Sequence, residues 1–112
     1  MIDLATVLPG DPRVVFRDAD LLLICDRWQS VMADLPTASA IVTDPPYSAR
    51  THAAQRSAPR DPVAAAHGFA ALEYEAWSDE QATYAANEWS IKSRGWCVVF
   101  SDHALARVYE SA

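Results

Sequence analysis

Long apolar runs, glycines and cysteines are scarce in this chain, and each scarcity excludes a class of protein. The longest apolar run, Leu21–Cys25, is far too short to cross a bilayer. No basic start precedes an apolar signal region, so we expect a cytoplasmic protein without membrane partners. The two cysteines, Cys25 and Cys97, lie in apolar runs and are expected to be buried free thiols. Histidines and cysteines are too few and too scattered to predict a metal site.

Basic residues are also in short supply. The chain has 9 Lys and Arg against 15 Asp and Glu, a net charge of -6. This balance argues against a general phosphate-binding face, so any DNA contact must come from a local patch. One segment, Ser48–Pro62, is expected to be a polar loop, and its arginines Arg50, Arg56 and Arg60 precede the first acid, Asp61.

The composition that remains is typical of a globular domain. The 112 residues are 51% hydrophobic and 21% charged, which suits one domain with a modest core. Three apolar runs, each predicted to be a strand, end at an acid. They are Leu21–Cys25 before Asp26, Ala38–Thr43 before Asp44, and Trp96–Ser101 before Asp102. We expect the first of these strands to be covered on both faces. A further short strand is predicted at Arg13–Phe16.

Helical patterns separate these strands. The apolar spacing from Trp28 to Leu35 predicts a helix, and Ser78 with Gln81 predicts the capping box of a second helix that closes at Gly95. A third apolar pattern with helical spacing begins at Leu105. Strands that alternate with helices predict an α/β fold with parallel strands, whose carboxyl ends share one ligand-binding edge. Asp26 and Asp102 can equally serve as helix N-caps, whereas this alternative is weaker for Asp44, because prolines rather than a regular helix follow it.

The central run stops at Asp44-Pro45-Pro46-Tyr47. The two prolines prevent the strand from continuing, because each lacks an N–H and has a fixed φ. The result is a stiff rim that carries a carboxylate, unpaired carbonyls and an aromatic ring, which suits a flat polar heterocycle. The simpler interpretation is a proline turn with an exposed tyrosine.

These residues resemble motif IV, [DNS]-P-P-[YFW], of the DNA methyltransferases that modify adenine N6 or cytosine N4. The order of strand, acid, helix and Asp-Pro-Pro-Tyr is similar to the permuted members of that family. The resemblance implies a partial three-layer α/β sandwich of the Rossmann-like methyltransferase type, truncated at its carboxyl end. Residues 1–19 would then be an extension or short edge strand, and residues 20–112 a partial catalytic domain.

The resemblance also implies roles for individual residues. Asp44 and the Pro45 carbonyl would accept hydrogen bonds from the amine, beside Pro46, and Tyr47 would stack on a base extruded from DNA. S-adenosylmethionine would be the methyl donor, and Asp26 would lie near its adenine end. The three arginines named above would face DNA. Adenine N6 is the favoured target, and cytosine N4 is the other.

One element of the family pattern is missing from the sequence. No Asp/Asn-x-Phe-x-Gly-x-Gly loop is present to cradle the cofactor. We therefore expect a fragment that binds S-adenosylmethionine weakly or not at all, and that self-associates through an uncovered sheet. Two alternatives remain: an RNA or protein amino-methyltransferase, which uses a related Asn-Pro-Pro-Tyr motif, and a non-catalytic remnant or binding module.

Overall fold

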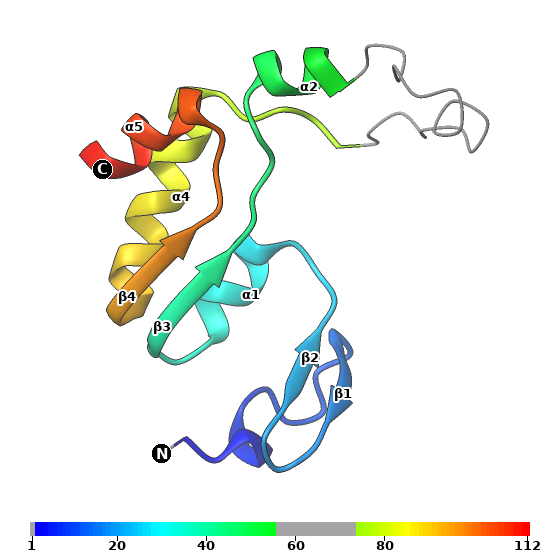
Figure 1. Cartoon of the computed structure of the whole chain (residues 1–112). Helices are drawn as coiled ribbons and strands as arrows, with labels where there is room; N and C mark the ends of the chain where they lie inside the picture. The colour runs from blue at the N-terminus through cyan, green and yellow to red at the C-terminus, as the bar shows by residue number, and fades with distance from the viewer. Residues whose placement is uncertain (1, 56–73) are drawn as a thin grey trace, which may run out of the picture. The chain divides into compact units, whose positions relative to one another are not determined.

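The computed structural model describes residues 2–55 and 74–112 and has a mixed α/β fold (Figure 1). The chain divides into an N-terminal unit, Met1–Ala38, and a C-terminal unit, Ser39–Ala112. Its described strands form two separate two-stranded sheets, one of β1 and β2 and the other of β3 and β4. No helix in the described part of the chain is both long enough and apolar enough to cross a membrane.

The N-terminal unit is a β-hairpin with two short helices. It contains η1 (Leu4–Thr6), β1 (Val14–Arg17), β2 (Leu22–Ile24) and α1 (Trp28–Asp34). The strands β1 and β2 are antiparallel, with Arg17 opposite Leu22. Asp18 closes the turn between them, because its Oδ1 accepts hydrogen bonds from the backbone N–H groups of Asp20 and Leu21. The strand predicted at Arg13–Phe16 and the helix predicted from Trp28 to Leu35 are confirmed by β1 and α1.

The pairing of β2 corrects one prediction. We expected Leu21–Cys25 to lie in one parallel sheet with the other two strands, covered on both faces. It pairs with β1 instead, and Leu21 and Leu23 are each 53% exposed. The Asp18 turn explains this result, since it folds the strand back on its sequence neighbour. Cys25 and Cys97 are free thiols but exposed, so their predicted burial is wrong.

Two arginines link the segments of the N-terminal unit. The Arg17 guanidinium donates hydrogen bonds to the carbonyls of Leu4, Val7 and Leu8. The Arg13 guanidinium bridges the carboxylates of Asp11, at 2.6 Å, and Asp34, at 2.8 Å. The Arg17 bonds satisfy the carbonyls of Val7 and Leu8, which lie outside regular secondary structure. The bonds of both arginines also connect the first ten residues and α1 to the hairpin.

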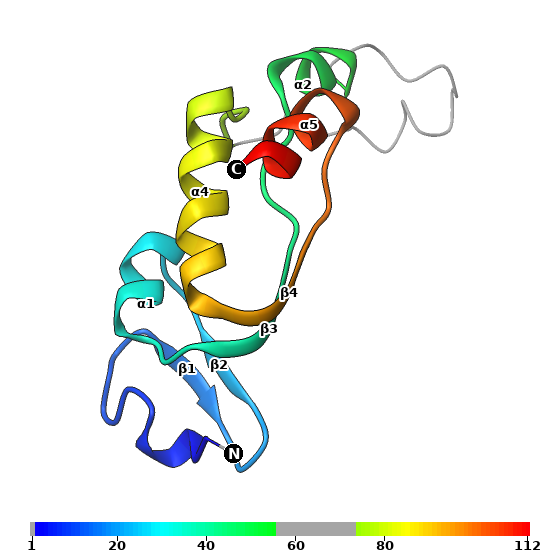
Figure 2. The ribbon, with the colours of Figure 1, turned by 90° about the vertical axis from the view of Figure 1, so that its left-hand side faces the viewer.

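The C-terminal unit contains the second sheet and three described helices. Strand β3 (Ala38–Thr43) is followed by α2 (Ala49–Gln55), α4 (Asp79–Lys92), β4 (Ser93–Val99) and α5 (His103–Ser111). Strands β3 and β4 run parallel (Figure 1). Figure 2 views this pair from its edge, with α4 along one side, and α4 packs against both β4 and α5. This is the strand–helix–strand unit that the alternating pattern predicted.

Local chemistry explains where these elements begin and end. The capping box of α4 is confirmed, since Ser78 Oγ accepts from the N–H of Gln81 and the Gln81 side chain accepts from the N–H of Ser78. The helix ends at Lys92 rather than at Gly95, which lies inside β4. Gly95 is required there because a Cβ on it would lie 2.6 Å from the Ser39 carbonyl oxygen.

The predicted polar loop Ser48–Pro62 is also corrected in part. Residues 49–55 form α2, an alanine-containing helix, and residues 56–62 lie outside the described residues. The loop prediction treated polar side chains as a sign of irregular backbone, whereas α2 carries polar residues on a helix whose buried side includes His52.

The core of the C-terminal unit is an aromatic stack. The Trp77 and Trp89 rings are 6.1 Å apart, and the Trp89 and Tyr109 rings are 6.3 Å apart, all close to parallel. Three side chains from α4 and α5 complete the buried set: Ala82, Ala85 and Leu105. The sheet is less covered than expected for a core strand, because Val42 is 68% exposed and Trp96 is 79% exposed.

Candidate functional site

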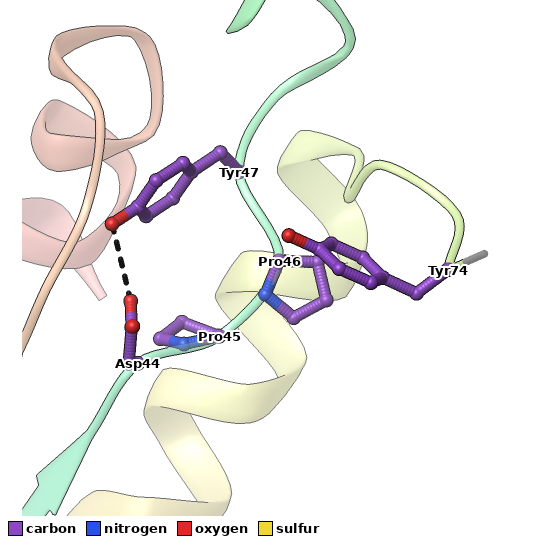
Figure 3. A pocket seen from close by; sticks show the side chains of 5 residues that line it. All are labelled: Asp44, Pro45, Pro46, Tyr47 and Tyr74. Atoms are coloured by element: carbon purple, nitrogen blue, oxygen red, sulfur yellow. Dashed lines mark hydrogen bonds between the residues drawn. The ribbon is translucent and has the colours of Figure 1, made fainter. Parts of the chain in front are cut away.

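The Asp-Pro-Pro-Tyr motif lies at the carboxyl end of β3 and forms most of a surface pocket. The pocket has a volume of about 260 Å³ and is lined by Asp44, Pro45, Pro46, Tyr47 and Tyr74 (Figure 3). All five residues belong to the C-terminal unit. Pockets for drug-sized ligands hold roughly 300–1,000 Å³, so this one suits a single heterocycle rather than a whole cofactor.

The backbone fixes both ends of the motif. Before it, the Thr43 carbonyl accepts a hydrogen bond of 2.9 Å from the N–H of Phe100, which ties the end of β3 to the end of β4. After it, the Tyr47 carbonyl accepts a hydrogen bond of 3.0 Å from the N–H of Trp77. Pro45 is buried, whereas Asp44 remains exposed. The motif is therefore a held rim with an accessible carboxylate, as its two prolines predicted.

Two polar groups of the pocket, the Tyr47 hydroxyl and the Asp44 carboxylate, are paired with each other. The Tyr47 hydroxyl donates a hydrogen bond of 3.2 Å to Asp44 Oδ1 (Figure 3). That bond, and then the charge of Asp44, raises the pKa of Tyr47. Tyr47 thus occupies an acceptor site of Asp44 without using the full capacity of the carboxylate, since a carboxylate offers about four lone-pair sites. A ligand amine can use the remaining sites or displace the hydroxyl.

Asp102 connects the motif to α5. Its carboxylate accepts hydrogen bonds from the N–H of Ser48 at 3.0 Å and from the hydroxyls of Ser48 and Thr51 at 2.5 Å. Its other oxygen accepts from the N–H of Leu105, so Asp102 is the N-cap of α5. Partial burial on its own would raise the pKa of Asp102, but these hydrogen bonds outweigh it and lower the pKa. The ionised carboxylate therefore positions the residues that follow Tyr47.

Tyr74 is the member of the pocket that sequence reasoning missed. It lies 27 positions after Tyr47, and the pairing of Trp77 with Tyr47 brings its segment to the motif. The His52 ring of α2 contacts Tyr74 edge-to-face, with centroids 5.1 Å apart and planes at 80°. The sequence carries only a weak signal for Tyr74. It shows an aromatic cluster, Tyr74 to Trp77, without a periodic spacing that would assign it to a helix or a strand.

The other predicted site residues are not among the described residues that line this pocket. Asp26 belongs to the N-terminal unit, where it accepts hydrogen bonds from the N–H of Arg27 and the hydroxyl of Ser30, and these bonds lower its pKa. Arg50 lies on α2, exposed, with its guanidinium 3.4 Å from His103 Nε2. Arg56 and Arg60 lie outside the described residues.

Asp26 and the glycines are the described residues that bear on the expected weak binding of S-adenosylmethionine. Asp26 is engaged by its own helix, and neither described glycine forms a phosphate- or methionine-binding loop. Gly10 has a φ of 68° in an open turn, and Gly95 permits close approach of β3 and β4. No group of three potential metal ligands gathers within residues 2–55 and 74–112. Among the described residues, the pocket is lined by the motif and Tyr74 alone.

Compared with known proteins, the chain matches no family model, no curated protein and no solved structure. A function for the pocket has to come from its own geometry. That geometry joins one accessible carboxylate, a proline rim and two tyrosine rings. Such a set recognises a planar group that donates hydrogen bonds from its edge.

Proposed function

We propose that the pocket binds a nucleobase with an exocyclic amino group, and that the chain carries the base-binding part of a DNA amino-methyltransferase. The observation that carries this proposal is the Asp44–Tyr47 pair, in which an exposed carboxylate stands beside an aromatic ring on a fixed proline rim. Adenine is the favoured base and cytosine the second. The full match of residues 44–47 to motif IV supports the same assignment.

The chemistry of the residues fits this role. The amine of a base is a poor nucleophile because its lone pair is delocalised into the ring. Hydrogen bonds from the amine to Asp44 and to the Pro45 carbonyl favour a tetrahedral nitrogen and stabilise positive charge that develops on it. Tyr47 supplies a stacking face once its hydroxyl turns away from Asp44. Because no cofactor cradle is described, we assign no step to S-adenosylmethionine, whose sulfonium would supply the methyl group.

The proposal extends to the fold and to DNA. The β3–α4–β4 unit is the repeating unit of a Rossmann-like sandwich, and the exposed face with Val42 and Trp96 is one that a further layer would cover. Arg50, on the helix that follows the motif, would contact DNA phosphate, together with Arg56 and Arg60. In a complete site Asp26 would lie near the cofactor's adenine.

Nucleoside titrations test the proposal on the chain as it exists. Deoxyadenosine and deoxyinosine differ at position 6, where one has an amine and the other a carbonyl that would face the Asp44 carboxylate. We expect nuclear magnetic resonance shifts at the amides of Tyr47, Tyr74 and Trp77 with deoxyadenosine and much smaller ones with deoxyinosine. Deoxycytidine and deoxyuridine form a second matched pair.

Variants of Asp44 show whether the carboxylate makes this distinction. Asp44→Ala should remove the preference for the amino-bearing nucleoside, and Asp44→Asn should keep part of it, because an amide retains one acceptor oxygen. In a full-length relative, where transfer from labelled S-adenosylmethionine can be followed, losses at such electrostatic sites are on the order of a hundred-fold or more. Equal shifts with all four nucleosides in the wild-type chain would contradict the proposal.

A further inference from the structure

We propose that Tyr74 is a second stacking ring of the base pocket, that His52 positions it, and that the two rings make the pocket prefer purines to pyrimidines. This inference rests on the proposed function. It starts from the shape of the pocket, because Tyr74 is the one lining residue that lies outside the Asp-Pro-Pro-Tyr motif. Figure 3 shows its ring beside Pro46, with its hydroxyl directed toward the motif.

The position of Tyr74 is set by two separate contacts. The backbone of its segment pairs with the motif, through the N–H of Trp77 and the bridge between Ser48 and Trp77. Its ring contacts the His52 ring edge-to-face, and His52 comes from α2 and is only 5% exposed. An edge-to-face aromatic contact fixes ring orientation as well as distance. Tyr74 is therefore a held ring, while 48% of it remains exposed and open to a ligand.

His52 acts on the pocket only through Tyr74. It does not line the pocket, and its Nε2 is buried with no hydrogen-bond partner in the described structure. Its contribution at this point is the ring that packs edge-to-face with Tyr74. His52 is thus a positioning residue through its edge-to-face contact with Tyr74, and another aromatic ring of similar size should replace it in this role.

Two rings change which base the pocket favours. Tyr47 alone gives one stacking face of limited area, which a pyrimidine can nearly cover. Tyr74 adds a face from a different segment, and a fused two-ring purine has the larger surface to place on it. Removing Tyr74 should therefore weaken a purine more than a pyrimidine. The preference for a base with an exocyclic amine depends on Asp44 and should therefore remain.

The experiment measures dissociation constants of deoxyadenosine, deoxyinosine and deoxycytidine by nuclear magnetic resonance titration of the wild-type chain and variants. Tyr74→Ala should weaken deoxyadenosine binding about ten-fold and deoxycytidine binding less. Tyr74→Phe should bind like the wild type. Tyr84→Ala is the matched control, because Tyr84 is an exposed tyrosine of α4 outside the pocket.

The role of His52 is tested by rescue. His52→Ala should reproduce much of the Tyr74→Ala loss, and His52→Phe should restore deoxyadenosine binding, because it keeps the ring edge. Circular dichroism confirms that each variant is folded. If His52→Ala is not folded, the shift of the Tyr74 ring protons in His52→Phe still reports whether an edge-to-face contact is present.

The outcomes separate this inference from the proposed function. Suppose that the wild type prefers deoxyadenosine to deoxyinosine but Tyr74→Ala leaves both affinities unchanged. The proposed stacking role of Tyr74 is then wrong, and the proposed base site is retained. If Tyr74→Ala weakens both nucleosides equally while deoxyadenosine remains favoured over deoxyinosine, both proposals are supported. A wild type without any preference for the amine overturns both. An unchanged ratio of deoxyadenosine to deoxycytidine affinity in Tyr74→Ala would overturn the purine preference.

Discussion

The two units of this chain are stabilised by different kinds of interaction. In the N-terminal unit, guanidinium groups of Arg13 and Arg17 reach across loops, and few apolar side chains are buried. In the C-terminal unit, stacked aromatic rings and small helix residues form the core around Trp89. The candidate pocket lies in the C-terminal unit, which is stabilised by packed rings. The proposed base-binding rim needs a scaffold that holds its backbone in place, and packed rings provide one.

Each unit nevertheless depends on one charged side chain that satisfies several backbone or hydroxyl groups. Arg17 donates to three carbonyls, and Asp102 accepts from two hydroxyls and two backbone N–H groups. The difference lies in what surrounds them. Asp102 is adjacent to the aromatic core and to the pocket motif, so its loss should affect the function of the site as well as its stability.

Removal of the Asp102 carboxylate should have the largest effect. Asp102→Ala deletes a helix cap and the bonds to Ser48 and Thr51, and should lower the free energy of unfolding by about 3 kcal/mol. Hydrogen exchange at α2 and at Tyr47 should rise with it. Glu110→Ala, an exposed acid on the same helix, is the control. A stability loss no larger than that of the control would mean that packing alone holds the motif.

The pH dependence of the same site sharpens this prediction. Because the folded-state pKa of Asp102 is lowered, its stabilising effect is complete above the unfolded value of about 3.9 and is lost as the pH falls through the folded value. Asp102→Asn keeps the cap but cannot accept as many hydrogen bonds. It should be less stable than wild type at pH 7, and the difference should shrink only below about pH 4. Urea unfolding over this range measures it.

The corresponding change in the N-terminal unit is Arg17→Ala. It removes the guanidinium donor from the Val7 carbonyl and one of two donors from the carbonyls of Leu4 and Leu8, which keep the N–H groups of Val7 and Asp11. This loss should destabilise that unit by about 2 kcal/mol. Nucleoside binding at the pocket should not change. Arg27→Ala is the control, since Arg27 is exposed and makes no side-chain capping bond. Hydrogen exchange of the hairpin amides is the measurement. Altered nucleoside affinity in Arg17→Ala would show that the units do not act separately.

The sequence predicted the local chemistry well and the long-range pairing poorly. Ser78 with Gln81 and Asp102 before α5 are caps that depend on neighbours within a few residues, and both are confirmed. The Asp-Pro-Pro-Tyr rim followed from proline geometry alone. Leu21–Cys25 was assigned to the wrong sheet because an apolar run does not identify its partner strand. Tyr74 was missed for the same reason, since only the backbone pairing of Trp77 with Tyr47 brings it to the motif.

The smallest predicted effect tests whether the core of the C-terminal unit depends on stacking alone. The Tyr109 hydroxyl is buried and has no hydrogen-bond partner in the described part of the chain. Burial, and then the negative charge of Asp102, raises the pKa of Tyr109 to about 12. An unpaired hydroxyl in such a place costs free energy, so Tyr109→Phe should leave stability unchanged or raise it by up to about 1 kcal/mol.

Tyr109→Ala provides the contrast, because it removes the ring that stacks on Trp89 and should cost about 3 kcal/mol. Chemical unfolding followed by tryptophan fluorescence compares the two variants. A loss of more than about 1 kcal/mol in Tyr109→Phe would mean that the hydroxyl is satisfied in solution. The C-terminal unit would then be held by polar bonds in its core as well, and the contrast with the arginine-linked N-terminal unit would be one of degree rather than of kind.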